Sequence, residues 1–233
     1  MAHNGSHGGR MVTLKSGDGA EILCYHVKAE GKRPEDRKGG LVLIMEIFGV
    51  TAHIKDLCDG YAARGYDVLS PQLYDRQVKD FQATYAQEDI QRSLELRAAN
   101  TYDNTVLDVQ MCIDRLRADG NEKVFITGYC YGGSVSWVAA CRAKGLDAAS
   151  CYYGGAIKQF IGENPKCPTI CHFGEKDHGI PMEDVRAIEA AHPEVKVYVY
   201  DADHGFNSDR RNNYDKAAAD LALKRTLELF EGA

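Results

Sequence analysis

Residues 124–140, VFITGYCYGGSVSWVAA, contain an apolar β-type run, a cysteine framed by glycines, and a run of small residues typical of a helix. This order predicts a strand, a sharp turn and a helix, with Cys130 at the turn. A residue on such a turn has a strained backbone, so its neighbours two positions away must be nearly free of side chain, as Gly128 and Gly132 are. We therefore expect Cys130 at the carboxyl end of a strand, where open α/β sheets bind ligands and a helix N-terminus favours a thiolate.

The alternative is that Cys130 is a small buried hydrophobic residue, as most free cysteines are. The chain has eight cysteines and no CxxC pair. Cys167 and Cys171 share one expected strand, which favours neither a metal site nor a disulfide. We expect reduced thiols that lie mostly in the core, and the glycine framing separates Cys130 from them as a candidate nucleophile.

The composition is that of an ordinary soluble globular protein. The chain has 233 residues, of which 44% are hydrophobic and 27% charged, with a net charge of −6. This balance argues against a basic nucleic-acid surface. The longest strongly apolar run, residues 41–45, is too short for a signal peptide or a membrane span, so we expect a cytoplasmic protein without a membrane segment.

Residues 1–10, MAHNGSHGGR, are polar, glycine-rich and tag-like, so we expect a disordered tail and leave its histidines out of the site. Residues 11–233 are expected to form a single domain. Apolar residues at 12–14 and 22–27 flank a Gly-Asp-Gly turn and predict a hairpin at the edge of the sheet.

The rest of the chain alternates between β-type and helical patterns. This alternation predicts an α/β fold, a three-layer sandwich with a mostly parallel central sheet. Residues 77–103 are polar and predict a partly helical excursion over the functional edge. The further expected strands are 41–45, 67–70, 148–153, 168–173 and 195–200, and the further expected helices are 52–64, 106–116, 181–191 and 213–230.

A thiol nucleophile needs a base, and the base needs an acceptor that fixes its tautomer. Asp177 lies in the loop after one expected strand, and His204 lies in the loop after the next. The order nucleophile, acid, histidine is that of the α/β-hydrolase fold. Taken singly, Asp177 is better explained as a turn-forming aspartate and His204 as a surface turn histidine. Their positions relative to Cys130 favour a triad.

Two neighbouring residues are rival candidates. His172 lies within an apolar strand, which indicates a buried, hydrogen-bonded histidine. Asp203 is adjacent to His204 on an extended segment, where successive side chains point apart, so we expect it to orient the loop.

Five motifs together resemble the dienelactone hydrolases (carboxymethylenebutenolidases), and the likeness runs from about residue 11 to the C-terminus. The motifs are MEIFG at 45–49, LYDRQ at 73–77, GYCYGG at 128–133, DHGIP at 177–181 and HGF at 204–206.

The resemblance implies a triad of Cys130, Asp177 and His204. It also implies an oxyanion hole formed by the backbone N–H groups of Ile47 and Tyr131. Glu46 is then the acid that, in this family, hydrogen-bonds the resting thiol and takes its proton when substrate arrives. The implied reaction is ring opening of a lactone, which needs no metal or organic cofactor.

Arg76 matches its motif, and we expect it to hold the carboxylate of a small anionic substrate, since a guanidinium binds carboxylates bidentately. The alternative is an arginine that pairs with a nearby acid. Chlorocatechol-pathway members have a second arginine four residues after the histidine. Ser208 occupies that position here, and Arg210 and Arg211, which follow it, are candidates for the second contact.

Other functions stay open. The chain is alternatively a broader small-ester carboxylesterase, a thiol redox sensor that uses Cys130, or a binding module without activity. We expect a small-molecule substrate, no nucleic-acid partner, and a monomer or small homo-oligomer.

Overall fold

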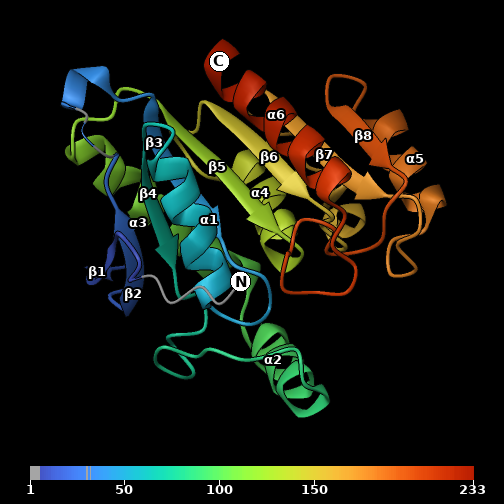
Figure 1. Cartoon of the computed structure of the whole chain (residues 1–233), viewed down its shortest axis with the longest axis horizontal. Helices are drawn as coiled ribbons and strands as arrows, with labels where there is room; N and C mark the ends of the chain where they lie inside the picture. Colours follow the sequence, from blue (N-terminus) through green and yellow to red (C-terminus); the bar gives the residue numbers. More distant parts are fainter. Residues whose placement is uncertain (1–5, 30, 32) are drawn as a thin grey trace.

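The structure, a computed structural model, describes residues 6–29, 31 and 33–233. Eight strands and six helices follow one another along these residues (Figure 1). The strands are β1 (Arg10–Lys15), β2 (Glu21–Val27), β3 (Gly39–Ile44), β4 (Tyr66–Pro71), β5 (Val124–Tyr129), β6 (Ala148–Tyr152), β7 (Thr169–Gly174) and β8 (Lys196–Tyr200). The helices are α1 (Ala52–Ala62), α2 (Gln87–Ala99), α3 (Tyr102–Ala118), α4 (Tyr131–Arg142), α5 (Met182–Ala191) and α6 (Lys216–Gly232), with short 3₁₀ turns at Pro34–Asp36 and Ile157–Phe160.

One sheet contains all eight strands, in the order β1-β2-β4-β3-β5-β6-β7-β8. The β1–β2 hairpin and the β2–β4 pair are antiparallel, and every later pair is parallel. This is the predicted mostly parallel sheet with an edge hairpin. Because β3 to β8 run in one direction, their carboxyl ends meet at a single edge.

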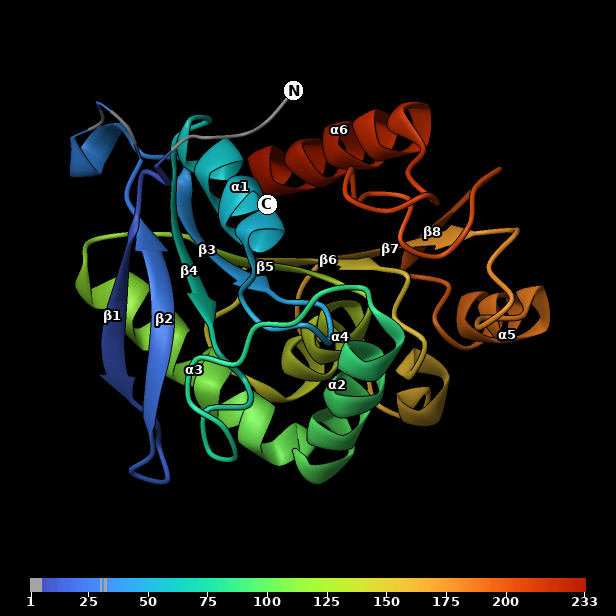
Figure 2. The ribbon, with the colours of Figure 1, turned by 60° about the horizontal axis from the view of Figure 1, so that its bottom comes forward.

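Helices cover both faces of this sheet and form the predicted three-layer sandwich (Figure 2). Helices α1 and α6 lie on one face, and α3, α4 and α5 lie on the other. All six residues of β3 and of β5 are buried, as expected for strands covered on both sides. No helix in the described part of the chain is long and apolar enough to cross a bilayer.

Strand β1 begins at Arg10, one residue before the domain boundary that the sequence predicts. Just before it, the backbone N–H groups of Gly8 and Gly9 donate to the side chains of Asp59 and Tyr25, at 3.0 and 2.7 Å. Residues 1–5 of the predicted tail lie outside the described residues.

The predicted excursion at 77–103 consists of a loop followed by α2. This helix projects beyond the carboxyl edge of the sheet (Figures 1 and 2), and only Ser93 and Leu96 of its 13 residues are buried. Helix α2 therefore contributes little to the hydrophobic core.

Candidate active site

Cys130 stands on the turn between β5 and α4, with backbone angles φ 58° and ψ −117°. This left-handed conformation is strained for a residue with a side chain. The turn is possible because the residues two positions before and after Cys130 are glycines without a side chain. A Cβ on Gly128 would lie 2.2 Å from the carbonyl oxygen of Gly132. A Cβ on Gly132 would lie 2.5 Å from the carbonyl oxygens of Ile44 and Met45. The end of β3 therefore packs directly against the turn.

Three predicted side chains meet at this point in a hydrogen-bonded series. The Sγ atom of Cys130 lies 3.1 Å from Nε2 of His204, and Nδ1 of His204 lies 2.6 Å from Oδ2 of Asp177. Asp177 and His204 come from the loops that follow β7 and β8. The other oxygen of Asp177 accepts a hydrogen bond from the backbone N–H of Gly179 at 2.8 Å, which orients the carboxylate.

The charge of His204 is set by this series. Burial alone would lower its pKa, but the Cys130 sulfur and the Asp177 carboxylate outweigh burial and raise the pKa from 6.5 to about 10. The arrangement thus favours the imidazolium form of His204. A cation next to a cysteine is the setting in which a reactive thiolate forms.

The three residues lie in a cavity of about 710 Å³. Its lining includes Arg97, Ala98, Asn100 and Tyr102, from the end of α2 and the start of α3, and residues of the loops after β7 and β8. This volume suits a small molecule.

Ile47 and Tyr131 are the residues whose backbone N–H groups the sequence predicts for the oxyanion hole. Tyr131 is the first residue of α4, and Ile47 follows β3. Within the described residues, neither backbone N–H donates a hydrogen bond to a protein group. The contact between Gly132 and the end of β3 brings these two segments together beside Cys130.

Comparisons with known proteins show the family of this chain. The model of the "Dienelactone hydrolase family" matches residues 25–233. The "Putative carboxymethylenebutenolidase" of Escherichia coli K12 is 32% identical over 91% of this chain and 83% of its own length. "Carboxymethylenebutenolidase 1" of Cupriavidus pinatubonensis is 30% identical over 94% of this chain and 95% of its own length.

The chain belongs to the dienelactone hydrolase family. It is thereby a carboxylic ester hydrolase with an α/β-hydrolase fold. A solved structure from Klebsiella pneumoniae, titled "Putative Dienelactone Hydrolase", superposes with a TM-score of 0.83 at 26% identity and covers 97% of this chain and 98% of its own.

Glu46 is almost fully buried, at 1% exposure, but its described hydrogen bond does not go to the thiol. Tyr85 O–H donates to Glu46 Oε2 at 3.1 Å, and the Arg211 guanidinium lies 3.7 Å from Oε1. The Tyr85 hydroxyl also contacts Ser208 at 3.1 Å. Burial and the Glu46 charge together raise the pKa of Tyr85 to about 12, so the phenol stays protonated.

The expected carboxylate contact at Arg76 needs correction, because the structure places this side chain outside the cavity. Its guanidinium donates to both oxygens of Asp108 at 2.8 Å and to Asp18 at 2.8 and 3.0 Å. Asp108 is fully buried and needs a counter-ion there. Arg76 in turn lowers the pKa of Asp18 to about 2. It joins the β1–β2 turn to α3, which corresponds to the pairing alternative.

Arg210 and Arg211 also lie outside the cavity lining. Arg210 pairs with Asp56 and Asp209. Arg211 stacks over the Tyr85 ring at 5.1 Å and faces Glu46. Neither arginine therefore provides the second contact to a substrate carboxylate that was expected from the sequence. Arg211 instead offsets the charge of Glu46.

The rival residues have structural partners. His172 is fully buried and contacts Ser150 and Tyr200 at 3.1 and 2.8 Å, and burial lowers its pKa to about 3. Asp203 accepts a hydrogen bond from the backbone N–H of His204 at 2.6 Å and so orients the loop.

Sequence reasoning missed Tyr85, which holds Glu46, and the cavity residues Arg97, Asn100 and Gln159. The polar character of residues 77–103 indicated a segment over the site, but not which of its side chains faces the cavity. Which of these side chains faces the cavity depends on the path of α2 and of the loops that flank it.

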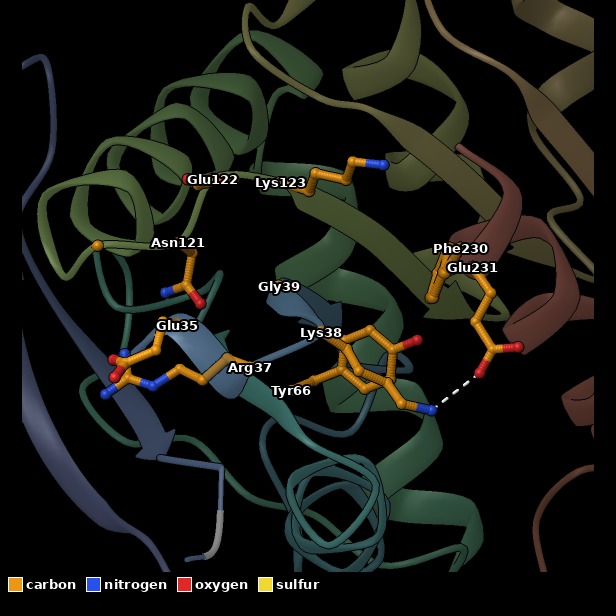
Figure 3. A pocket seen from close by; sticks show the side chains of 11 residues that line it. Glu35, Arg37, Lys38, Gly39, Tyr66, Asn121, Glu122, Lys123, Phe230 and Glu231 are labelled. Atoms are coloured by element: carbon orange, nitrogen blue, oxygen red, sulfur yellow. Dashed lines mark hydrogen bonds and ion pairs between the residues drawn. The ribbon is translucent and has the colours of Figure 1, made fainter. Parts of the chain in front are cut away.

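A second cavity, of about 690 Å³, lies at the opposite edge of the sheet, where β3, β4 and β5 begin (Figure 3). Charged side chains dominate its lining, including the pair of Lys38 and Glu231 at 2.8 Å. Its described lining holds no cysteine, serine or histidine. The contacts among Cys130, His204 and Asp177 therefore distinguish the Cys130 cavity as the candidate active site.

Proposed function

We propose that the protein hydrolyses a small lactone of the dienelactone type to an open-chain acid of the maleylacetate type, with Cys130 as nucleophile, His204 as base and Asp177 as its orienting acid. The observation that carries this proposal is the series of contacts from Cys130 Sγ through His204 to Asp177, at 3.1 and 2.6 Å, in a cavity large enough for such a molecule. Family membership supports the same chemistry.

In the first step the Cys130 thiolate attacks the carbonyl carbon of the lactone. The backbone N–H groups of Ile47 and Tyr131 stabilise the oxyanion that forms. The ring C–O bond then breaks, and the enolate oxygen that leaves takes the proton held at Nε2 of His204. A thioester at Cys130 and an enol remain.

In the second step neutral His204 removes a proton from water, and the resulting hydroxide attacks the thioester. The bond to sulfur breaks, which releases the carboxylic acid and restores the thiolate and the imidazolium. Asp177 holds His204 in the required tautomer throughout, through its contact with Nδ1.

Glu46 controls the protonation of the thiol in this proposal. A buried carboxylate close to sulfur disfavours a second negative charge. The hydrogen bond from Tyr85 and the nearby Arg211 hold this carboxylate and offset its charge, which supports a thiolate paired with His204.

Measuring acid release at constant pH tests the proposal. Wild type should open dienelactone isomers faster than it hydrolyses 4-nitrophenyl acetate, and Cys130→Ala should do neither. Faster turnover of simple esters than of every lactone would favour the broader carboxylesterase. If wild type turned over neither substrate, the proposal would be wrong, and the alternatives would be a thiol redox sensor or a binding module without activity.

A further inference from the structure

We infer that Tyr153 is a further positioning residue of this site: its aromatic ring supports the imidazolium of His204 and keeps it facing Cys130. This inference rests on the proposed function, in which His204 takes and gives the proton, and it adds a residue that the sequence motifs do not assign. Tyr153 directly follows β6, and its side chain is buried at 1% exposure.

The backbone of Tyr153 is strained. Its φ angle is 36°, in the left-handed region that residues with a bulky side chain rarely adopt. Among the described residues, Asp80 and Cys130 are the other two non-glycine residues with a positive φ, and a short polar side chain such as that of aspartate tolerates this conformation. Such strain persists only where the surroundings fix it, and it collects at functional sites. The strain at Tyr153 therefore points to a function, as the strain at Cys130 does.

Two backbone hydrogen bonds fix the chain at Tyr153. The backbone N–H of Cys130 donates to the carbonyl oxygen of Tyr152 at 3.1 Å, and the backbone N–H of Tyr153 donates to the carbonyl oxygen of His172 at 2.7 Å. A Cβ on Gly133 would lie 2.1 Å from the Tyr152 carbonyl oxygen, so the start of α4 packs directly against this segment. The position of Tyr153 is thus tied to the turn that carries the nucleophile.

The ring of Tyr153 lies against the ring of His204. The two ring centroids are 5.0 Å apart with their planes tilted by 58°, and Phe206 packs edge-on against Tyr153 at 5.1 Å. An aromatic face attracts a cation within about 6 Å of its centroid, and the attraction is stronger where water is excluded. Because Tyr153 is buried, its ring stabilises the charged form of His204 relative to the neutral form.

The charged and thiol side chains around these two rings come from several elements: Glu46, Arg97, Cys130, Asp177, His178, Asp203 and Arg211. Cys130 and Asp177 contact the two nitrogens of the imidazole, whereas Tyr153 packs against its ring. Burial, with the Glu46 and Cys130 charges, raises the pKa of Tyr153 well above its usual value, so the phenol stays neutral. What Tyr153 offers His204 is therefore its aromatic ring and not a charge.

Fluorination of the ring tests this inference with little change in shape. Position 153 is prepared as Tyr153→Phe and, in a second protein, with 3,4,5-trifluorophenylalanine, whose ring face is electron-poor. Imidazole nitrogen chemical shifts should show the wild-type titration midpoint of His204 in Tyr153→Phe and a midpoint lower by about 0.5–1 pH unit in the fluorinated protein. The kcat for 4-nitrophenyl acetate should be about two- to tenfold lower in the fluorinated protein than in Tyr153→Phe, because an imidazolium forms as His204 takes a proton from water.

Tyr152 provides the matched control. It is the neighbouring buried tyrosine, but its ring packs against His172, with centroids 4.4 Å apart. Tyr152→Phe and the trifluorophenylalanine protein at position 152 should therefore share one His204 midpoint.

Three results would overturn the role of Tyr153. They are equal His204 midpoints in the two proteins altered at position 153, a fall that is already complete in Tyr153→Phe, and an equal fall on fluorination at position 152. Hydrolysis by wild type that Cys130→Ala abolishes would uphold the proposed function in each of these cases. The predicted shift without any hydrolysis by wild type would overturn the proposed function and leave the contact between Tyr153 and His204 established.

Discussion

The protonation of His204 depends on the two groups that its ring contacts. Because the Cys130 sulfur and Asp177 raise the pKa of His204 from 6.5 to about 10, the ring should remain an imidazolium at pH 8. Cys130→Ala removes the sulfur, whose charge makes the largest contribution among those that raise the pKa of His204, so the titration midpoint of His204 should fall. Nitrogen chemical shifts of the imidazole, measured by NMR from pH 5 to 10, follow both states.

A neutral His204 ring at pH 8 in wild type would mean that the thiol and the imidazole share no ion pair at rest. The midpoint belongs to the coupled pair and not to one residue. The comparison with Cys130→Ala is therefore the informative quantity.

Tyr85 should control how Glu46 affects the thiol. Burial raises the pKa of Tyr153, and the charges of Glu46 and Cys130 both add to that shift, which motivates a test of whether the carboxylate acts on the sulfur. Tyr85→Phe removes the hydrogen bond to Glu46, and we expect slower alkylation of Cys130 by iodoacetamide at neutral pH, because a carboxylate released from Tyr85 disfavours the thiolate. Glu46→Gln should change the pH dependence of alkylation and cancel the effect of Tyr85→Phe. Alkylation profiles identical to wild type in both variants would show that Glu46 has no part in thiol protonation.

The strand-turn-helix element is held together by close backbone contacts. Gly128→Ala would place a methyl group 2.2 Å from the Gly132 carbonyl oxygen, so the turn must shift. We expect a loss of roughly 1–3 kcal/mol in unfolding free energy, as for overpacked sites, and loss of hydrolysis as Cys130 moves. Gly162→Ala is the control, because nothing lies within 4 Å of its added Cβ. Urea unfolding of both variants measures the difference, and equal midpoints would contradict the packing of this turn.

Most elements follow from sequence patterns because each depends on local chemistry. The apolar run at 41–45 corresponds to β3, which is buried throughout, and Pro181 immediately precedes α5 near the predicted helix start. The boundaries differ by a few residues, as for the predicted helix 213–230: α6 begins at Lys216, where the Asp215 side chain accepts the backbone N–H of Ala218. That cap depends on the path of the preceding loop, which no periodicity specifies.

Contacts between distant segments were less predictable. Cys130, Asp177 and His204 could be placed together because parallel strands deliver their loops to one edge. The side chain of Arg76 does not contact these residues and instead pairs with Asp108 and Asp18, which are 32 and 58 residues away in the sequence. The motif around Arg76 carries no information on such partners, and the position of Arg97 depends equally on how α2 leaves the fold.

The Arg76 cluster should stabilise the whole molecule. Arg76→Ala would leave the fully buried Asp108 carboxylate without a counter-ion, and breaking such a pair costs about 3 kcal/mol of unfolding free energy. Arg76→Ala with Asp108→Asn should recover part of the loss, because no unpaired charge remains. Exposed Arg92 is the control, since Arg92→Ala should change stability by less than about 1 kcal/mol. Stability of Arg76→Ala equal to wild type would show that the cluster is not structural.

The central claim is that Cys130 is the nucleophile of an ester hydrolase, and a covalent intermediate tests it most directly. Wild type mixed rapidly with 4-nitrophenyl acetate and quenched in acid should carry an acetyl group that peptide mass spectrometry maps to Cys130. Cys130→Ala should lose turnover and unfold at nearly the wild-type temperature, whereas Cys167→Ala, at the other cysteine that is not fully buried, should behave as wild type. Hydrolysis near the wild-type rate in Cys130→Ala, or an acetyl group on another residue, would contradict the account.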